Sequence, residues 1–305
     1  MKNFSEERHA LHIYQNTPER FLLFYTVSDF LVFFTIVCTC ARKHGVRVLG
    51  ICPMYDHLHI LVLANSRKEV FEFVRDYTRQ YSKELNKSIG RTGTVFTPIF
   101  GCAVKTGDKA IRTACSYHYN NPGEKKLCRR AEEYRWTFLA YAISDHPFSE
   151  KIVLNKSSRP MRRAIKMLDY FRSLDKPLTH GLLNRLFSEL NNDEKNQLTD
   201  RIISKYNCID YESLISLYGS YDKMCLAFAS NQGKEYDIEE VFEPGTHLVY
   251  PTLSATIHKQ FGYGEVKDVF KLSLTDQESL AYSLIRMTGA QRWQIRKFFR
   301  WHQNA

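Results

Sequence analysis

Two histidines separated by one residue are the sharpest chemical feature of this 305-residue sequence. His57 and His59 flank Leu58 in an apolar run that ends at Leu63. In a β-strand, residues two apart project to the same face, so both imidazoles would point one way and leave Leu58 for the core. Such a pair can chelate a metal ion, although these three residues alone are also explained by two histidines on a solvated sheet face.

A second group of polar residues lies in the run Y-H-Y-N-N-P, which begins at Tyr117. Tyr117 and Asn121 are four residues apart, so on a helix they share a face, whereas Tyr119 points roughly the opposite way. A phenol beside an amide can supply a nucleophile and a metal-coordinating oxygen. Taken alone, these residues are also explained by a core tyrosine and an asparagine that caps a helix before Pro122.

The elements that must position these residues alternate between strands and helices. Hydrophobic periodicity predicts an α+β sheet with helices on one face and an antiparallel hairpin around Tyr55. The other face of the sheet is left for chemistry. In chain order we expect a strand at 9–14, a strand ending near 26, a helix at 29–43, strands at 46–54 and 57–63, an amphipathic helix from 67, an extended segment at 94–105 and a helix at 108–121.

The combination of motifs resembles the REP-associated tyrosine transposases, which are single-tyrosine members of the HUH nuclease superfamily. The resemblance runs from about Arg8 to Tyr141. It is carried, in order, by R-F-L-L-F-Y, S-D-F, P-M-Y-D-H-L-H-I-L-V, R-T-G-T-V-F-T-P-I-F, Y-H-Y-N-N-P and E-E-Y-R-W-T-F-L-A-Y. Two places depart from the family pattern: Asp56 stands where asparagine is usual, and Gly123-Glu124 follows N-P where the family tends to carry an apolar and a basic residue.

The resemblance implies a ferredoxin-like or RRM-like antiparallel sheet on which His57 and His59 bind a divalent metal ion, Mg or Mn. It implies that Tyr117 is the nucleophile and that Asn121 is the third metal ligand. The partner it implies is single-stranded DNA with a hairpin structure, cleaved to a 5′-phosphotyrosine and a free 3′ hydroxyl without a nucleotide cofactor. Whether the protein acts as a monomer or a homodimer stays open.

The bulk composition agrees with a polyanionic partner without requiring one. Lys and Arg outnumber Asp and Glu by 43 to 33, which gives a formal charge of +10. Eight cysteines without a C-x-x-C pair, in a sequence with no secretory signal at its start, indicate reduced thiols in a cytoplasmic protein. The long apolar run after Arg20 is interrupted by Ser28 and Asp29, so we expect a buried helix and no membrane span.

From about Phe148 onward helical patterns dominate, apart from a weak strand pattern near Val249. We therefore predict a nuclease domain at 1–148 and a helical C-terminal domain at 149–305. Two basic stretches in the second domain are candidate DNA contacts. One begins a helix, and the other forms the second helix of a helix-turn-helix near 274–301; their residues are Arg159, Arg162 and Arg163, and Arg292, Arg296 and Lys297. A solvated face and a generic basic helical hairpin are the simpler interpretations.

Together these features predict a metal-dependent single-stranded DNA endonuclease and strand transferase, which is the activity of a transposase. The two departures from the family pattern leave an alternative, a domesticated, non-catalytic DNA-binding or regulatory protein that keeps the fold. A third hypothesis is an RNA-binding module, because RRM-like sheets also bind single-stranded RNA.

Overall fold

The computed structural model describes residues 9–230 and 246–302, and it has the α+β architecture that the sequence predicts. Its sheet has four antiparallel strands in the order β2-β3-β1-β4. The first strand of the chain therefore lies between the third and the fourth. The strands are β1 (His9–Asn16), β2 (Arg47–Met54), β3 (His57–Leu63) and β4 (Gly101–Thr106).

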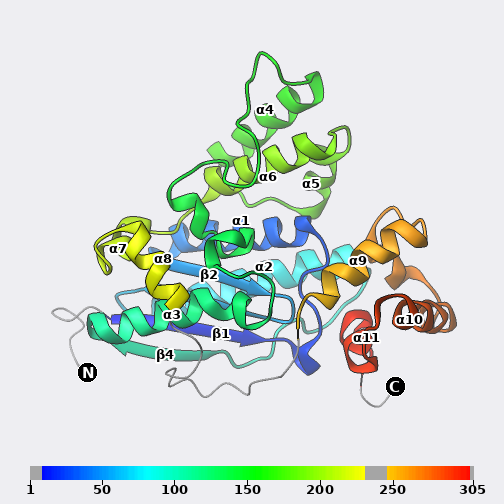
Figure 1. The fold of residues 1–305 in the computed structure, drawn as a ribbon, viewed down its shortest axis with the longest axis horizontal. Helices are drawn as coiled ribbons and strands as arrows, with labels where there is room; N and C mark the ends of the chain where they lie inside the picture. Colours follow the sequence, from blue (N-terminus) through cyan, green and yellow to red (C-terminus); the bar gives the residue numbers. More distant parts are fainter. Residues whose placement is uncertain (1–8, 231–245, 303–305) are drawn as a thin grey trace.

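Helices make up most of the rest of the described chain (Figure 1). The α-helices are α1 (Val27–His44), α2 (Arg67–Ile89), α3 (Gly107–Glu124), α4 (Arg159–Ser173), α5 (His180–Phe187), α6 (Asn192–Tyr206), α7 (Tyr211–Ser216), α8 (Tyr221–Ser230), α9 (Val249–Gln260), α10 (Leu274–Thr288) and α11 (Arg292–Phe299). Short 3-10 helices are η1 (Pro18–Arg20), η2 (Ala131–Glu133), η3 (Arg135–Thr137), η4 (Leu139–Ala142) and η5 (Val266–Lys271).

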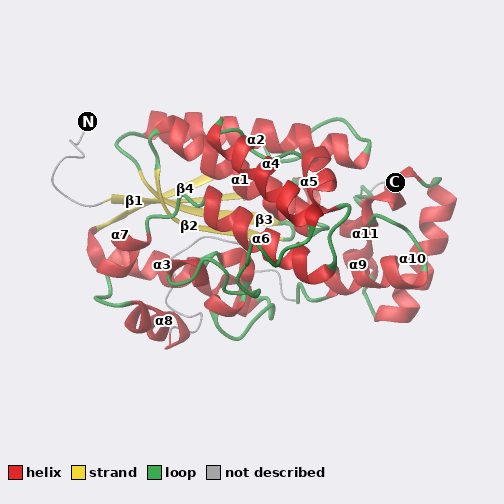
Figure 2. Ribbon diagram, turned by 90° about the horizontal axis from the view of Figure 1, so that it is seen from above, coloured by secondary structure: helices red, strands yellow, loops and turns green. Residues whose placement is uncertain are grey.

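Helices α1 and α2 pack on one face of the sheet, which confirms the expected helical layer (Figure 2). Leu58 and Ile60 of β3 point into this layer and are fully buried. The local sequence sets the limits of both helices. The Ser66 hydroxyl accepts a hydrogen bond from the Glu69 amide at the start of α2, and Gly45 ends α1 in the left-handed conformation with φ 66°.

Helix α3 packs on the opposite face, so the sheet carries helices on both sides (Figure 2). Its apolar residues Ile111 and Ala114 join Leu61 of β3 in a separate hydrophobic cluster. The helix was expected to end at Pro122 but continues to Glu124. A proline near the end of a helix removes only its own N–H, and the Lys125 amide still bonds the Asn121 carbonyl at 3.2 Å.

The expected strand ending near Thr26 is wrong, because no strand of the described residues pairs with this segment. The Leu22 amide bonds the Lys297 carbonyl in α11, and the Leu23 amide bonds the Tyr55 carbonyl in the turn between β2 and β3. The apolar side chains of the segment are buried in the main core. The residues were thus correctly expected to be buried, but their backbone partners come from distant parts of the chain.

The weak strand pattern near Val249 is also wrong, since this segment forms α9. Tyr250, Leu253 and Ile257 are buried and recur at intervals of three and four residues, as one helix face requires. Pro251 lies in the first turn of the helix, where no intrahelical partner for its missing N–H is needed.

The helical C-terminal part packs on the sheet part through one continuous core. Helices α5 and α6 contact α1, and α4 lies outside them (Figure 1). Leu183 and Ile202 from these helices belong to the same hydrophobic cluster as Phe33 of α1. The division at residue 148 stays a prediction; the packing shows that the two parts share buried surface. In the part of the chain that the structure describes, no helix has both the length and the hydrophobicity that crossing a bilayer would require.

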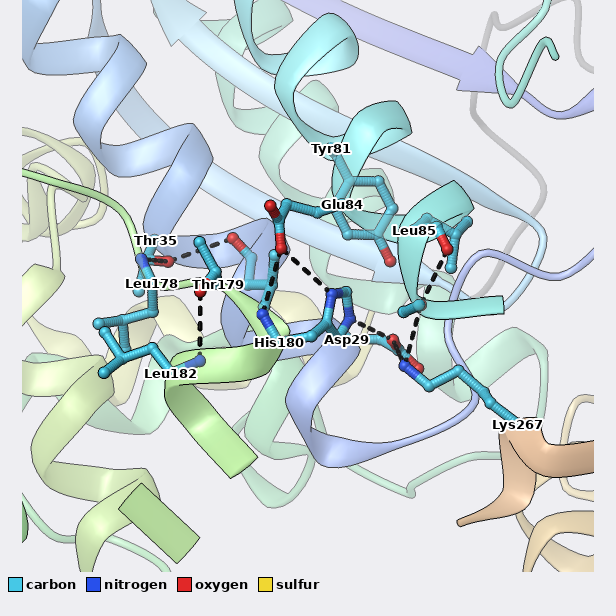
Figure 3. A network of polar contacts seen from close by, with 12 residues as sticks. Asp29, Thr35, Tyr81, Glu84, Leu85, Leu178, Thr179, His180, Leu182 and Lys267 are labelled. Carbon is cyan, nitrogen blue, oxygen red and sulfur yellow. Dashed lines mark hydrogen bonds and ion pairs between the residues drawn. The ribbon is translucent and has the colours of Figure 1, made fainter. Parts of the chain in front are cut away.

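A buried ionic group joins several of these helices at the start of α1 (Figure 3). Asp29 accepts hydrogen bonds from His180 Nε2 and Lys267 Nζ, both at 2.7 Å. Glu84 of α2 lies on the other side of the imidazole, 3.6 Å from His180 Nδ1. We call Asp29, Glu84, His180 and Lys267 the Asp29 cluster. Since its members come from α1, α2, α5 and η5, it ties four separate segments together.

Candidate active site

The two paired histidines lie where the strand pattern places them. His57 and His59 of β3 are buried on the sheet face that α3 covers, while Leu58 lies in the core on the other face. The centroids of the two imidazole rings are 5.1 Å apart. The strand geometry therefore brings both rings to one side, as predicted.

Helix α3 brings Tyr117 to the same place. Its ring makes edge contacts with His59 at a centroid distance of 5.7 Å and with His12 at 5.6 Å. Tyr117 is only 8% exposed. The sheet and α3 thus assemble a buried group of rings, His12, His57, His59, Tyr117 and His118, which we call the histidine cluster.

His12 of β1 was not among the predicted site residues. It lies opposite Leu61 in the β1–β3 pairing, and the next residue on its face, Tyr14, lies opposite His59. The segment H-A-L-H-I-Y alternates apolar core residues with His12 and Tyr14, so the period of two carried a signal. What the sequence could not show is that β1 pairs directly with β3.

A hydrogen bond links two of the imidazoles. His12 Nε2 lies 3.1 Å from His59 Nδ1, so one nitrogen donates and the other accepts. Burial, followed by the charge of Lys105, lowers the pKa of His12 to about 4. Burial also lowers the pKa of His59 and of His118 well below the usual value. At neutral pH these imidazoles are uncharged, which is the form that binds metal ions.

Asp56, which departs from the family pattern, holds the other histidine. Its Oδ1 lies 2.6 Å from His57 Nδ1, and the carboxylate is buried. Burial raises the pKa of Asp56, but the hydrogen bond and charge of His57, with the charges of His247 and Lys297, outweigh it and hold the pKa below the usual range. Asp56 therefore stays ionised and orients His57 rather than serving only as a turn residue.

Two residues of the C-terminal part reach this carboxylate. Lys297 Nζ of α11 lies 3.3 Å from Asp56 Oδ2, and His247 Nε2 lies 3.6 Å from Asp56 Oδ1. Lys297 was expected on a DNA-facing helix surface, but it is 4% exposed, and the structure corrects this placement. The basic pattern of α11 could not reveal this contact, because its partner lies 241 residues earlier in the chain.

Asn121 lies one helical turn beyond Tyr117, as the sequence predicts, and it is buried. Its Nδ2 has no hydrogen-bond partner among the described residues. Nearby, Gly50 of β2 lets α3 approach closely, because an added Cβ would lie 2.6 Å from His118 Nε2. The Tyr119 hydroxyl donates to the Leu49 carbonyl at 2.9 Å and fixes the helix against this strand.

The predicted arginines do not join the histidine cluster. Arg159, Arg162 and Arg163 lie exposed on α4, in the helical layer beyond α1 as seen from the sheet (Figure 1). Arg163 forms an ion pair with Glu189 at 2.7 Å. In the helical hairpin, α10 and α11 are joined by Gly289 with φ 69°, as expected. Arg292 is exposed there, whereas Arg296 pairs with Glu19. Whether any of them contacts DNA stays a prediction.

The donors that could hold a metal ion are few. Over residues 9–230 and 246–302, no group of three or more histidine, cysteine, aspartate or glutamate side chains has the arrangement of a metal site. A bound ion would therefore need the two imidazoles together with an oxygen of another kind. The amide oxygen of Asn121 is the donor that the motif supplies.

The comparisons with known proteins agree with the motifs. Residues 7–121 match the family model described as transposase IS200 like. The match begins just before β1 and ends at Asn121, so it contains His12, His57, His59 and Tyr117. The predicted resemblance to transposases is confirmed for this segment. Everything beyond Asn121, including the three arginines of α4 and all of α11, lies outside the match.

One solved structure similar to this chain is described as a REP-associated tyrosine transposase bound to a REP hairpin. The similarity covers 45% of this chain and 79% of that chain, with 13% sequence identity and a TM-score of 0.37. No curated protein matches the chain.

Proposed function

We propose that this protein is a metal-dependent nuclease and strand transferase for single-stranded DNA, with Tyr117 as the nucleophile. The observation that carries the proposal is the way both paired histidines are held. His57 Nδ1 is bound to Asp56, and His59 Nδ1 is bound to His12. Histidines that ligate metals almost always give their second nitrogen to such a partner, so each would coordinate an ion through Nε2.

These residues fit a divalent ion, Mg or Mn, with Asn121 as a further oxygen donor. A bound ion would act as a Lewis acid on the scissile phosphate. The partners Asp56 and His12 fix the two ring orientations before any ion binds. Such preorganisation is the contribution that a protein makes to a metal site.

Tyr117 would then form the covalent bond. Its phenol oxygen gives up its proton and attacks the phosphorus of a phosphodiester. The bond from phosphorus to the 3′ oxygen breaks, and that oxygen takes up a proton and leaves as a 3′ hydroxyl. The 5′ phosphate stays on the tyrosine, so the number of phosphodiester bonds is conserved and a second 3′ hydroxyl can reverse the step. The ring contacts with His12 and His59 hold the phenol at this position.

The proposed substrate is a single strand that carries a hairpin. The net charge of +10 favours binding of nucleic acid, and the family that matches residues 7–121 consists of transposases. A reactive phenol that is 8% exposed requires that the strand displace a neighbouring group on binding.

A second candidate is a DNA-binding protein that no longer cleaves. A scissile phosphate must reach the phenol for cleavage. This candidate is favoured because Tyr117 is buried, and because Lys297 and His247 lie against Asp56. In that case the fold would be kept for binding alone.

Covalent trapping separates the two candidates. Labelled hairpin DNA with single-stranded flanks is incubated with the protein and Mn or Mg, and the products are separated under denaturing conditions. We expect an adduct that chelation with EDTA prevents and that Tyr117→Phe abolishes. Tyr14→Phe is the matched control, since the ring of Tyr14 lies 6.3 Å from that of His12. DNA binding without any adduct would support the second candidate. An adduct lost only in Tyr14→Phe would assign the nucleophile to Tyr14 and not to Tyr117.

A further inference from the structure

A cavity of about 430 Å³ lies between α2 and the segment that leads into β4. One wall is a stripe of α2 whose members, Phe71, Arg75, Thr78 and Arg79, recur at helical intervals and so share one face. The other wall is the segment 93–100, anchored by the buried side chains of Val95 and Phe96. The volume is within the range of ligand sites, which is roughly 300–1,000 Å³.

Aromatic and apolar side chains remain open to solvent at this cavity. Phe71 is 55% exposed, and its ring centroid lies 6.4 Å from that of Phe100. Ile99, at the adjacent tip, is 86% exposed. Leaving such surface in water forgoes the free energy of burial, so a cluster of this kind marks a binding surface. A pair of solvent-accessible rings is a platform on which a flat, unpaired base can stack.

The charge of the cavity points to the same class of ligand. Arg79 is engaged with Asp76 at 2.9 Å. Arg75, one turn from Phe71, is exposed and forms no ion pair with any residue in the described parts of the chain. A guanidinium one helical turn from an exposed aromatic ring presents a phosphate contact beside a stacking surface.

The cavity adjoins the end of the sheet that carries His57. The Thr97 amide and hydroxyl both bond the Asn16 carbonyl, at 2.9 and 3.2 Å. Asn16 is the residue of β1 that lies opposite His57 in the pairing with β3. Gln15, the residue before Asn16 in β1, lines the cavity itself. A strand whose phosphate lies at His57 can therefore continue past the sheet end into this cavity.

From this geometry we infer that the cavity is a subsite for one unpaired nucleotide that flanks the cleaved phosphate, with Phe71 stacking on its base and Arg75 contacting its phosphate. The inference rests on the proposed function, because it takes the substrate to be single-stranded DNA. It adds a second recognition site on the α2 side of the sheet, away from the face that holds the histidine cluster.

Binding measurements with Tyr117→Phe protein test the subsite without interference from cleavage. Two fluorescent probes are compared: a hairpin with about ten unpaired nucleotides of random sequence on each side, and the same hairpin with blunt ends. Phe71→Ala should weaken binding of the flanked hairpin roughly tenfold and leave the blunt hairpin unchanged. Tyr170→Ala, which removes an exposed ring from α4, is the matched control and should affect neither probe.

Salt dependence tests the second contact. Arg75→Gln should reduce the slope of log affinity against log salt by about 0.7 for the flanked hairpin, as loss of one single-strand phosphate contact predicts. Lys87→Gln, at an exposed position near the end of α2, should leave the slope unchanged.

Equal affinities for Phe71→Ala and Tyr170→Ala, or an equal loss on both probes, would overturn the subsite. If the unmutated protein still forms the covalent adduct in that case, the subsite is rejected and the proposed function is not. If the unmutated protein binds neither probe and forms no adduct, both the subsite and the proposed function are rejected.

Discussion

Two buried polar clusters lie on opposite faces of the sheet, and they are built in opposite ways. In the Asp29 cluster both carboxylate oxygens of Asp29 have partners. Oδ1 accepts from His180 and Lys267 (Figure 3), and Oδ2 accepts from the backbone amides of Tyr25 and Thr26. The charges are opposite in sign and adjacent. This is how a structural ion group is satisfied away from water.

The histidine cluster and its neighbour Asn121 leave more hydrogen-bonding groups without partners. In the Asp29 cluster only His180 Nδ1 lacks a hydrogen bond among the described residues, and it faces the Glu84 carboxylate at 3.6 Å. His12 Nδ1 and both ring nitrogens of His118 are buried and form no hydrogen bond with another described residue. The same holds for Asn121 Nδ2. Each such atom costs about 1–3 kcal/mol relative to a satisfied one. Packing of the surrounding side chains does not by itself offset this free-energy cost. The contrast agrees with a structural role for the first cluster and with the binding role proposed for the second.

The largest effects should come from the histidine cluster and should appear in activity rather than in stability. His59→Ala removes a proposed metal ligand, and we expect adduct formation to fall on the order of 100-fold or more. His12→Ala removes only the partner of that ligand and should cost roughly 10–100-fold. Rates of adduct formation at several Mn concentrations measure both. A folded His59→Ala protein with full activity would contradict the metal assignment.

The Asp29 cluster should show the reverse. Asp29→Ala leaves Lys267 and His180 buried without their carboxylate, and we expect a loss of about 3–5 kcal/mol in the free energy of unfolding. Urea denaturation measures it. Asp268→Ala is the control, since its pair with Lys271 lies at the surface and should contribute less than about 1 kcal/mol. Equal losses in the two variants would remove the structural role given to Asp29.

Lys297 connects the two parts of the chain at the histidine cluster. Lys297→Met keeps most of the length of the side chain but removes the charge beside Asp56, and through His57 it should slow adduct formation about tenfold. The Mn concentration that gives half the maximal rate should rise, which loss of stability alone would not cause. Lys271→Met is the charge-matched control. If the Mn concentration for half the maximal rate is unchanged, Lys297 contributes only to packing.

The smallest effect should be a pH dependence that belongs to the Asp29 cluster. Burial lowers the pKa of His180, but its hydrogen bond to Asp29 and the nearby Glu84 carboxylate outweigh this and raise the pKa above 6.5, whereas the pKa of Asp29 lies below 3.8. A histidine whose pKa is raised in the folded state contributes its full stabilisation below pH 6.5. The contribution is lost as the pH rises through the pKa of the folded state. The stability difference between the wild-type protein and His180→Asn should thus be largest between pH 3.8 and 6.5 and should shrink in alkaline solution. Thermal melts across pH 5–9 would show it.

Much of the fold and part of the site followed from local patterns. Alternation along β3 placed His57 and His59 on one face, and the spacing on α3 placed Tyr117 and Asn121 on one helix. Such predictions depend only on the period of a single element. They hold because each of these elements is long and regular.

The residues that were missed come to the site from other elements. His12 enters because β1 pairs with β3. His247 and Lys297 enter because the turn before α9 and helix α11 fold back on the sheet end. No period within one element carries this information. The same reason explains the segment before Thr26, whose backbone partners lie in α11 and in the turn at Tyr55.

The contact between Lys297 and Asp56 also has a consequence for the timing of synthesis. Asp56 and its neighbour His57 leave the ribosome 241 residues before Lys297 does. Until then the carboxylate that orients His57 lacks one of its two cationic or imidazole partners from the C-terminal part. A nascent chain can therefore fold its sheet early, but the surroundings of His57 are completed only when α11 docks. Under the proposed function, such an order would delay DNA cleavage until α11 has docked.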